Sequence, residues 1–202
     1  MKTTRILLLV AALAAVLVPG VRAAAAVGAP APEFTLTDLD GRPQALSALR
    51  GRIVVLEWVN PECPFVRKHY ESGNLPRLQK AATADGVVWL SVNSARDGAQ
   101  GDYDRAAVAA WAQATGAAPT AYLRDRDGAV GRLYGARTTP HLFVIDAAGT
   151  LAYAGAIDSI RSADAADIAD ATNYVTAALD ALKSGRPVAK PSTQPYGCPV
   201  KY

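Results

Sequence analysis

Residues 53–66, with the sequence IVVLEWVNPECPFV, contain the pattern that decides the fold of this 202-residue chain. Ile53–Val59 is almost entirely apolar, which is typical of a strand buried on both faces. Pro64 suits the first position of a helix, because the N–H that proline lacks is not needed there. Cys63 is therefore predicted at the junction of a buried strand and a helix, where α/β proteins build their sites.

The predicted surroundings of Cys63 favour a reactive thiol. Unpaired backbone N–H groups and the helix dipole favour an anion at the start of a helix. Arg67 and Lys68, one turn along, add positive potential, which Glu62 opposes. Since the thiolate is the nucleophilic form, Cys63 is the candidate catalytic residue. A buried, inert cysteine is the alternative interpretation.

The rest of the chain alternates predicted strands and helices. Strands are expected at 34–37, 87–92, 120–123, 142–145 and 151–157, and helices from 64 with a break at 72–74, then at 102–115, 128–134 and 164–183. Asp40-Gly41 predicts a hairpin after the first strand. This order predicts one α/β domain over residues 28–185, with a central mixed sheet flanked by helices and an N-terminal hairpin. Residues 186–202 are expected to form an extended C-terminal arm that carries Cys198.

Residues 1–23 have the features of a cleaved signal peptide. Lys2 and Arg5 precede the apolar run Ile6–Val18, and Val21-Arg22-Ala23 fits a cleavage site. The run is too short to span a bilayer comfortably. We therefore expect a periplasmic or secreted protein without stable membrane insertion, an uncleaved N-terminal anchor being the alternative.

The net charge gives no sign of a nucleic-acid partner. The whole chain has 21 Lys and Arg residues against 18 Asp and Glu residues. Three of the 21 lie in the predicted leader, which leaves 18 against 18 in the mature chain. A nominally neutral chain does not predict binding to nucleic acid or to anionic membranes.

A second motif, at 137–149 with the sequence RTTPHLFVIDAAG, leads into a predicted strand. Alone, its Thr139-Pro140 step is an ordinary loop proline, for which a trans bond is the commoner state. Together with the Pro-x-Cys-Pro motif it resembles the thioredoxin superfamily. The segments 28–36 (GAPAPEFTL), 60–70 (NPECPFVRKHY) and 195–202 (PYGCPVKY) extend this resemblance to the peroxiredoxin-like group of the AhpC/TSA, or redoxin, family.

The resemblance implies a thioredoxin fold in which Pro140 is a cis-proline facing the attacking thiol of Cys63. It also implies a substrate groove shaped by Thr139, Pro140, Trp58 and Pro64. Thioredoxin-like proteins use this proline to hold an extended substrate chain beside the thiol. Trp58 is most simply a core residue or a wall beside the site.

Departures from the family motifs separate two subclasses of activity. Val66 occupies the second cysteine position of the Cys-x-x-Cys motif of thioredoxins. Leu56 and Asn60 occupy the Pro and Thr/Ser positions of the peroxiredoxin motif, and Pro140 stands where peroxiredoxins place an arginine, with Arg137 three residues earlier. We therefore expect thiol–disulfide exchange, with thiol peroxidase (antioxidant) activity as the alternative.

Cys198 is the second of the two cysteines in the chain. Tyr196, Val200 and Tyr202 surround it and indicate that the arm docks on an apolar surface. An arm folded over the site lets Cys198 resolve an intermediate on Cys63 by thiol–disulfide exchange. A permanent structural Cys63–Cys198 bridge and intermolecular pairing are the other interpretations.

A cysteine–histidine metal site is a third alternative. His141 follows Pro140, and the resemblance places it near Cys63, where the pair would suit Cu(I) or zinc. Exported copper chaperones of this fold resemble a Cys-x-x-x-Cys-Pro pattern, but Val59 stands at its first position. We therefore expect no metal and no organic cofactor. His69 is expected on a solvated helix face.

The expected partners follow from the predicted exchange chemistry. The substrate is a protein or small-molecule disulfide, or a peroxide under the alternative activity. Electrons are expected from a thioredoxin-like donor.

Overall fold

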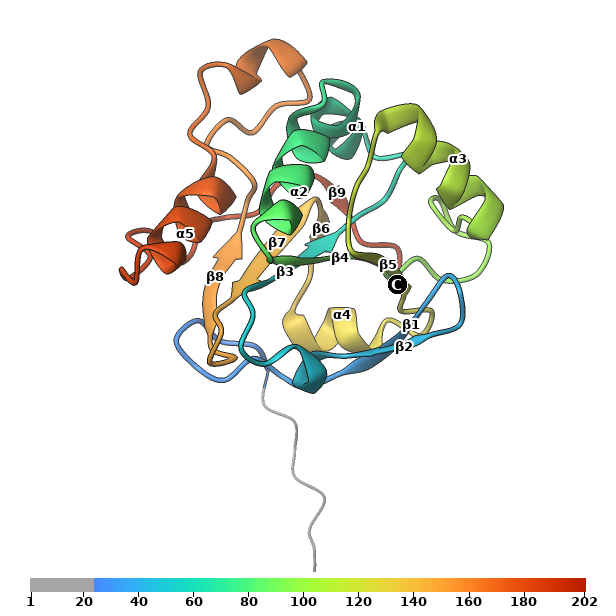
Figure 1. Ribbon diagram of the computed structural model, residues 1–202. Coiled ribbons are helices and arrows are strands. Elements are labelled where there is room, and N and C mark those ends of the chain that lie inside the picture. The colour runs from blue at the N-terminus through green and yellow to red at the C-terminus, as the bar shows by residue number, and fades with distance from the viewer. Residues whose placement is uncertain (1–23) are drawn as a thin grey trace, which may run out of the picture.

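The computed structural model describes residues 24–202, so the signal-peptide prediction lies outside the described residues. A seven-stranded mixed sheet has the order β2-β1-β5-β4-β3-β7-β8 (Figure 1). Its strands are β1 (Thr35–Asp38), β2 (Pro43–Ala45), β3 (Val54–Trp58), β4 (Val88–Asn93), β5 (Ala121–Arg124), β7 (His141–Ile145) and β8 (Leu151–Gly155). β3, β4 and β5 are parallel neighbours, while β1–β2, β1–β5, β3–β7 and β7–β8 are antiparallel. The predicted mixed sheet and N-terminal hairpin are confirmed.

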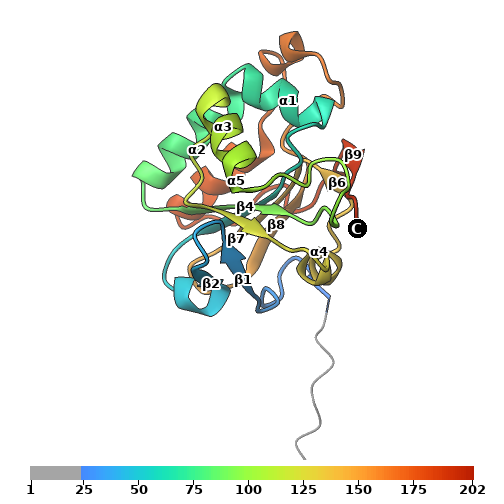
Figure 2. The same cartoon turned by 90° about the vertical axis from the view of Figure 1, so that its right-hand side faces the viewer.

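Helices cover both faces of the sheet. One face carries α1 (Pro64–Glu71), α2 (Asn74–Ala84), α3 (Arg105–Thr115) and α5 (Tyr174–Lys183), and the other carries the short α4 (Ala129–Tyr134) (Figure 2). Because successive side chains of each buried strand point to opposite faces of the sheet, the strands contribute to two hydrophobic cores, one on each side. Val55 and Val144 pack toward the four-helix face, whereas Leu56 and Phe143 pack toward α4. No helix within residues 24–202 is long and apolar enough to cross a membrane.

The prediction of one helix over 164–183 is wrong. Ala165–Ile168 forms a short 3-10 helix, and α5 begins only at Tyr174. The side chains of Asp164 and Asn173 each accept a hydrogen bond from a backbone N–H two or three residues on, both at 2.9 Å. Because each capping residue takes an extended conformation, the two caps divide the stretch into separate elements.

The C-terminal arm lies over the domain, as predicted. Ser192 forms a parallel bridge with Ala154 of β8. Further along, β9 (Cys198–Pro199) pairs antiparallel with β6 (Thr138–Thr139) in a separate two-stranded sheet. The arm ends at Tyr202, whose hydroxyl donates to the Ala136 carbonyl at 2.7 Å. It is therefore attached on both sides of Cys198.

Candidate active site

Cys63 lies at the junction of β3 and α1, as the sequence predicts. It is the N-cap residue of α1, and its carbonyl accepts the N–H groups of Val66 and Arg67. Its side chain is fully buried on the four-helix side of the sheet. The thiol donates a hydrogen bond to the carbonyl of Thr139 at 3.0 Å.

Asn60 shapes the loop that carries Cys63. Its Oδ1 accepts the N–H of Glu62 at 3.0 Å, and its carbonyl accepts the N–H of Cys63 at 3.0 Å. The side-chain Nδ2 donates to the Gln100 carbonyl at 3.2 Å. A Cβ at Gly101 would approach Asn60 Oδ1 to 2.3 Å, so glycine is required for this contact. Asn60 therefore bonds to its own loop and to the neighbouring one.

The Thr139–Pro140 peptide bond is cis, as the resemblance implied. Both residues are buried, and Thr139 lies opposite Cys198 in the register of β6 and β9. The N–H of Cys198 points at Cys63 Sγ with a separation of 3.4 Å. The Thr139 carbonyl and the Cys198 N–H thus both contact Cys63 Sγ, although the three residues lie far apart in the chain.

Cys198 is half-buried, and both cysteines are free thiols. Burial raises the pKa of the Cys198 thiol to about 12, with further contributions from its hydrogen bond to Cys63 and from the charge of Cys63. Cys198 is therefore protonated while the Cys63 sulfur is its neighbour.

Gly197 allows the arm to approach β6 closely. Its φ is 135°, a conformation that side-chain-bearing residues rarely adopt. A Cβ at this position would lie 2.0 Å from the Thr139 carbonyl oxygen. Glycine is therefore required before Cys198 by both backbone conformation and space.

The two basic residues expected to act on Cys63 are paired elsewhere. Arg67 forms an exposed ion pair with Glu71 at 2.7 Å. Lys68 is buried with its Nζ 3.8 Å from Asp158 Oδ2. Pro64 is exposed at the first position of α1.

Trp58 and His141 face the opposite side of the sheet from Cys63. They are paired in the register of β3 and β7, and the His141 ring lies 4.3 Å from that of Phe143. Trp58 is fully buried and donates to Ser94 Oγ at 3.0 Å, so it lies in the core and none of its surface lines a groove. His141 is not brought to Cys63. Residues 24–202 contain no cluster of three His, Cys, Asp or Glu side chains that could hold a metal ion.

The prediction of a solvated His69 is wrong, because the side chain is fully buried. The arm and the segment after β8 cover this side of α1, so that Tyr196 OH lies 3.2 Å and Asp158 Oδ2 lies 3.7 Å from His69 Nε2. No local pattern in the sequence indicates these contacts.

The two buried histidines predict a loss of stability in mild acid. Burial lowers the pKa of His141 to about 3 and that of His69 to about 4, whereas unfolded chains protonate histidine near pH 6.5. Because the unfolded state then binds more protons, the free energy of unfolding falls as pH drops from about 6.5 to about 4, by on the order of 3 kcal/mol for each histidine. Urea unfolding at a series of pH values across this range measures how the free energy of unfolding changes with pH.

His141→Gln should make the free energy of unfolding depend less steeply on pH than in the wild-type protein, whatever the substitution does to stability at neutral pH. Burial also raises the pKa of Glu57, which acts in the opposite direction because the native carboxyl binds a proton more readily. That contribution is common to both proteins and cancels in the comparison. Equal slopes would contradict the assignment of a neutral buried His141.

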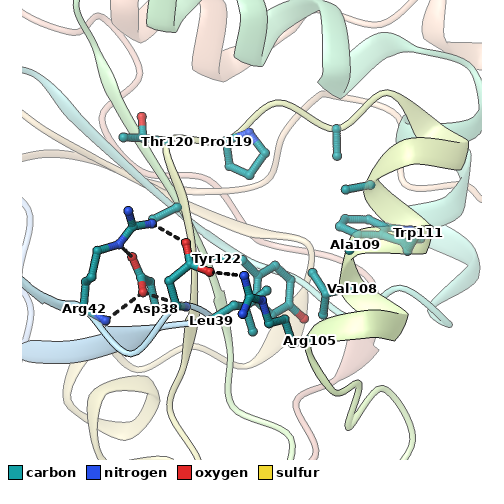
Figure 3. A pocket seen from close by; sticks show the side chains of 14 residues that line it. Asp38, Leu39, Arg42, Arg105, Val108, Ala109, Trp111, Pro119, Thr120 and Tyr122 are labelled. Carbon is teal, nitrogen blue, oxygen red and sulfur yellow. Dashed lines mark hydrogen bonds and ion pairs between the residues drawn. The ribbon is translucent and has the colours of Figure 1, made fainter.

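A hollow of about 390 Å³ lies between α3 and the ends of β1 and β5 (Figure 3). Val108, Trp111 and Tyr122 supply apolar walls. At its rim, Arg42 pairs with Asp38 at 3.0 Å, and Arg105 pairs with Asp40 at 2.6 Å. The charged side chains at the rim are therefore paired with one another. None of the lining residues forms a hydrogen bond with Cys63.

Comparisons with known proteins agree with this architecture. The model of the AhpC/TSA family matches residues 27–154. Among solved structures, a hypothetical protein from Sinorhizobium meliloti 1021 is 26% identical with a TM-score of 0.73, over 90% of this chain and 97% of that one. An uncharacterized conserved protein from Geobacillus kaustophilus is 28% identical with a TM-score of 0.71, over 88% and 92%.

A third solved structure is described as a thiol-redox protein. It is a putative thiol:disulfide interchange protein DsbE from Chlorobium tepidum, 26% identical with a TM-score of 0.50, over 63% of this chain and 83% of that one. A search of curated protein sequences found no match.

Proposed function

Since the chain belongs to the AhpC/TSA family and has a thioredoxin fold, we propose that it is an exported thiol–disulfide oxidoreductase in which Cys63 attacks and Cys198 resolves. The observation that carries the proposal is the approach of the arm to the buried thiol. The N–H of Cys198 lies 3.4 Å from Cys63 Sγ, and β9 pairs with β6 in a register that puts Cys198 opposite Thr139.

The reaction proceeds in two exchange steps. The Cys63 thiolate attacks one sulfur of the substrate disulfide, whose S–S bond breaks, and the departing thiolate takes up a proton. Cys198, after losing its proton, then attacks Cys63 Sγ, forms the Cys63–Cys198 disulfide and releases the second substrate thiol. The substrate gains two electrons and two protons, and the protein loses them. A thioredoxin-like dithiol donor restores the two free thiols.

The raised pKa of Cys198 supports this order of events. Part of the increase comes from the hydrogen bond and charge of Cys63. Both contributions end when Cys63 is bound in a mixed disulfide, because a disulfide sulfur carries no charge, while burial, the largest cause of the increase, remains. Cys198 therefore becomes a better nucleophile at the stage where it is needed.

The burial of Cys63 requires the arm to move before a substrate reaches it. With the arm in place the thiol is fully buried, and β9 occupies the edge of β6 beside Pro140. An incoming extended chain would need this edge, since strand addition uses the same backbone groups. The arm in its docked position therefore represents the closed protein.

The surroundings of Cys63 favour exchange over peroxidase chemistry. Asn60 occupies the motif position at which peroxiredoxins carry Thr or Ser, and its side chain bonds Glu62 N–H and the Gln100 carbonyl. Pro140 occupies the position of the peroxiredoxin arginine. The groups that would hold and polarise a peroxide are thus replaced by loop-forming residues.

The proposal predicts a reversible Cys63–Cys198 disulfide. Oxidised glutathione should convert the full-length mature protein to a form lighter by two hydrogens, seen by mass spectrometry under non-reducing conditions. A reduction potential above about −300 mV indicates a working couple, because structural disulfides lie below it. A lower potential would support a structural bridge and contradict the proposal.

A kinetic measurement distinguishes the peroxidase alternative. Stopped-flow mixing of the reduced protein with hydrogen peroxide should give a second-order rate constant no greater than that of free cysteine. A much faster reaction, with slow reaction toward oxidised glutathione, would favour the thiol peroxidase.

A further inference from the structure

A polar cluster, in which every member but the half-buried Asn74 is buried, holds the arm at a point two residues before Cys198. It consists of Asn74, His69, Tyr196, Asp158 and Lys68, and we refer to it as the arm anchor. Lys68, His69, Asp158 and Tyr196 are each at most 4% exposed. These residues come from α1, the start of α2, the segment after β8, and the arm. Their contacts therefore join four separate parts of the chain.

The hydrogen bonds of the arm anchor run in one direction. The Tyr196 hydroxyl donates to Asp158 Oδ1 at 2.5 Å, so its oxygen is left to accept from His69 Nε2 at 3.2 Å. His69 then carries its proton on Nε2, and its Nδ1 accepts from Asn74 Nδ2 at 2.9 Å. The Tyr196 hydroxyl is thus the central link, both donor and acceptor.

Removing Tyr196 from the anchor would leave buried polar groups without partners. Asp158 Oδ1 would retain only the N–H of Ile160 at 3.2 Å, and Asp158 Oδ2 has no hydrogen-bond partner even when the arm is docked. Lys68, which donates to the Ile160 carbonyl at 3.4 Å, lies 3.8 Å from that carboxylate. Removing a hydrogen bond from a buried charged group raises the free energy of the protein, so the anchor stabilises the docked arm.

Docking of Tyr196 controls the position of Cys198 because only Gly197 separates them. Gly197 lies so close to the Thr139 carbonyl that it cannot carry a Cβ. The Tyr196 ring also packs edge-on against Phe65 of α1, with ring centres 5.8 Å apart. The arm therefore has little freedom to slide along β6 while Tyr196 remains bound.

We propose that Tyr196 is the positioning residue for Cys198, and that its hydrogen bonds to Asp158 and His69 set the effective concentration of the resolving thiol at Cys63. This inference rests on the proposed function, and it adds the device that regulates the same site. An intramolecular thiol acts at a concentration fixed by how its tether is held. A stronger anchor thus favours the Cys63–Cys198 disulfide, and it also shields Cys63 from outside reagents.

Tyr196→Phe tests the proposal, because it removes the hydroxyl and keeps the ring. In the full-length mature protein, the equilibrium constant for forming the Cys63–Cys198 disulfide from oxidised glutathione should fall about tenfold. The rate at which iodoacetamide alkylates Cys63 in the reduced protein should rise by a similar factor. Tyr134→Phe is the matched control, since its hydroxyl bonds the Pro32 carbonyl on the other face of the sheet.

The two measurements separate failure of the inference from failure of the proposed function. A wild-type protein that forms no Cys63–Cys198 disulfide refutes the proposed function, while faster alkylation of Tyr196→Phe would still support the anchor. Wild-type values of both quantities in a folded Tyr196→Phe protein overturn the inference. If that variant does not fold, His69→Leu removes one of the two bonds from outside the arm. It should shift both quantities in the same direction, and unchanged values there overturn the inference.

Discussion

Cys63→Ser is expected to reduce disulfide-exchange activity to the rate of the uncatalysed reaction. A serine hydroxyl is not ionised at neutral pH and does not displace a thiolate from a disulfide, so the first step has no nucleophile. The fold should be unaffected, since the buried thiol donates one hydrogen bond, to the Thr139 carbonyl, and accepts one from the Cys198 N–H, and a hydroxyl can also make both. Turnover of oxidised glutathione with an added dithiol measures the activity, and circular dichroism checks the fold.

Cys198→Ser complements that variant, because it tests the second step of the reaction. It retains the attacking thiol and removes the resolving one, so the mixed disulfide between Cys63 and glutathione should accumulate and be visible by mass spectrometry. Cys63→Ser should form little adduct under the same conditions, because burial, the largest cause of the raised pKa of Cys198, is retained in this variant and disfavours its thiolate. An adduct on Cys198 alone would reverse the assigned roles. Loss of folding in both variants would indicate a structural pair.

The predicted features of the site are those with local signals. Pro64 after an apolar strand identifies a strand–helix junction, and Cys63 is indeed the N-cap of α1. The Thr139-Pro140 step is informative only together with the first motif, and its peptide bond is cis. The aromatic residues around Cys198 predict an arm docked on the domain, and in the structure the docked arm forms β9, which pairs with β6.

The features that were missed depend on contacts between distant segments. His69 and Tyr196 are separated by 127 positions, and their contact is what buries the histidine. The position of His141 next to Pro140 predicts a place near Cys63, but alternation along β7 turns its side chain to the other face of the sheet. A position in the chain does not specify which face of the sheet a residue occupies until the register of the neighbouring strand is known.

Glu57 is a feature that the sequence could have revealed. It is the one charged residue in the apolar run 53–59, and such a residue in a doubly buried strand requires polar partners. The structure supplies the indole N–H of Trp89 at 2.7 Å, the Tyr70 hydroxyl at 2.8 Å and the Gln79 amide at 3.1 Å. The helices and strands that meet over β3 are joined by these bonds.

Gly197→Ala is expected to open the arm and expose Cys63. A methyl group at this position would meet the Thr139 carbonyl oxygen at 2.0 Å and would require a backbone φ of 135°. Backbone atoms cannot move aside as a flexible side chain can, so β9 should separate from β6. We expect alkylation of Cys63 by iodoacetamide to accelerate by at least about tenfold, and the Cys63–Cys198 disulfide to become correspondingly less stable.

Gly185→Ala provides the matched control for that result. Gly185 also has a positive φ, 65°, but an added Cβ there would have no atom within 4 Å. It therefore reports the cost of backbone strain without a clash, and Cys63 should remain protected. If Gly197→Ala folds and protects Cys63 as well as the control does, the arm does not limit access to the thiol. If only Gly197→Ala exposes Cys63 and weakens the disulfide, access to Cys63 and delivery of Cys198 depend on the same contact between the arm and β6.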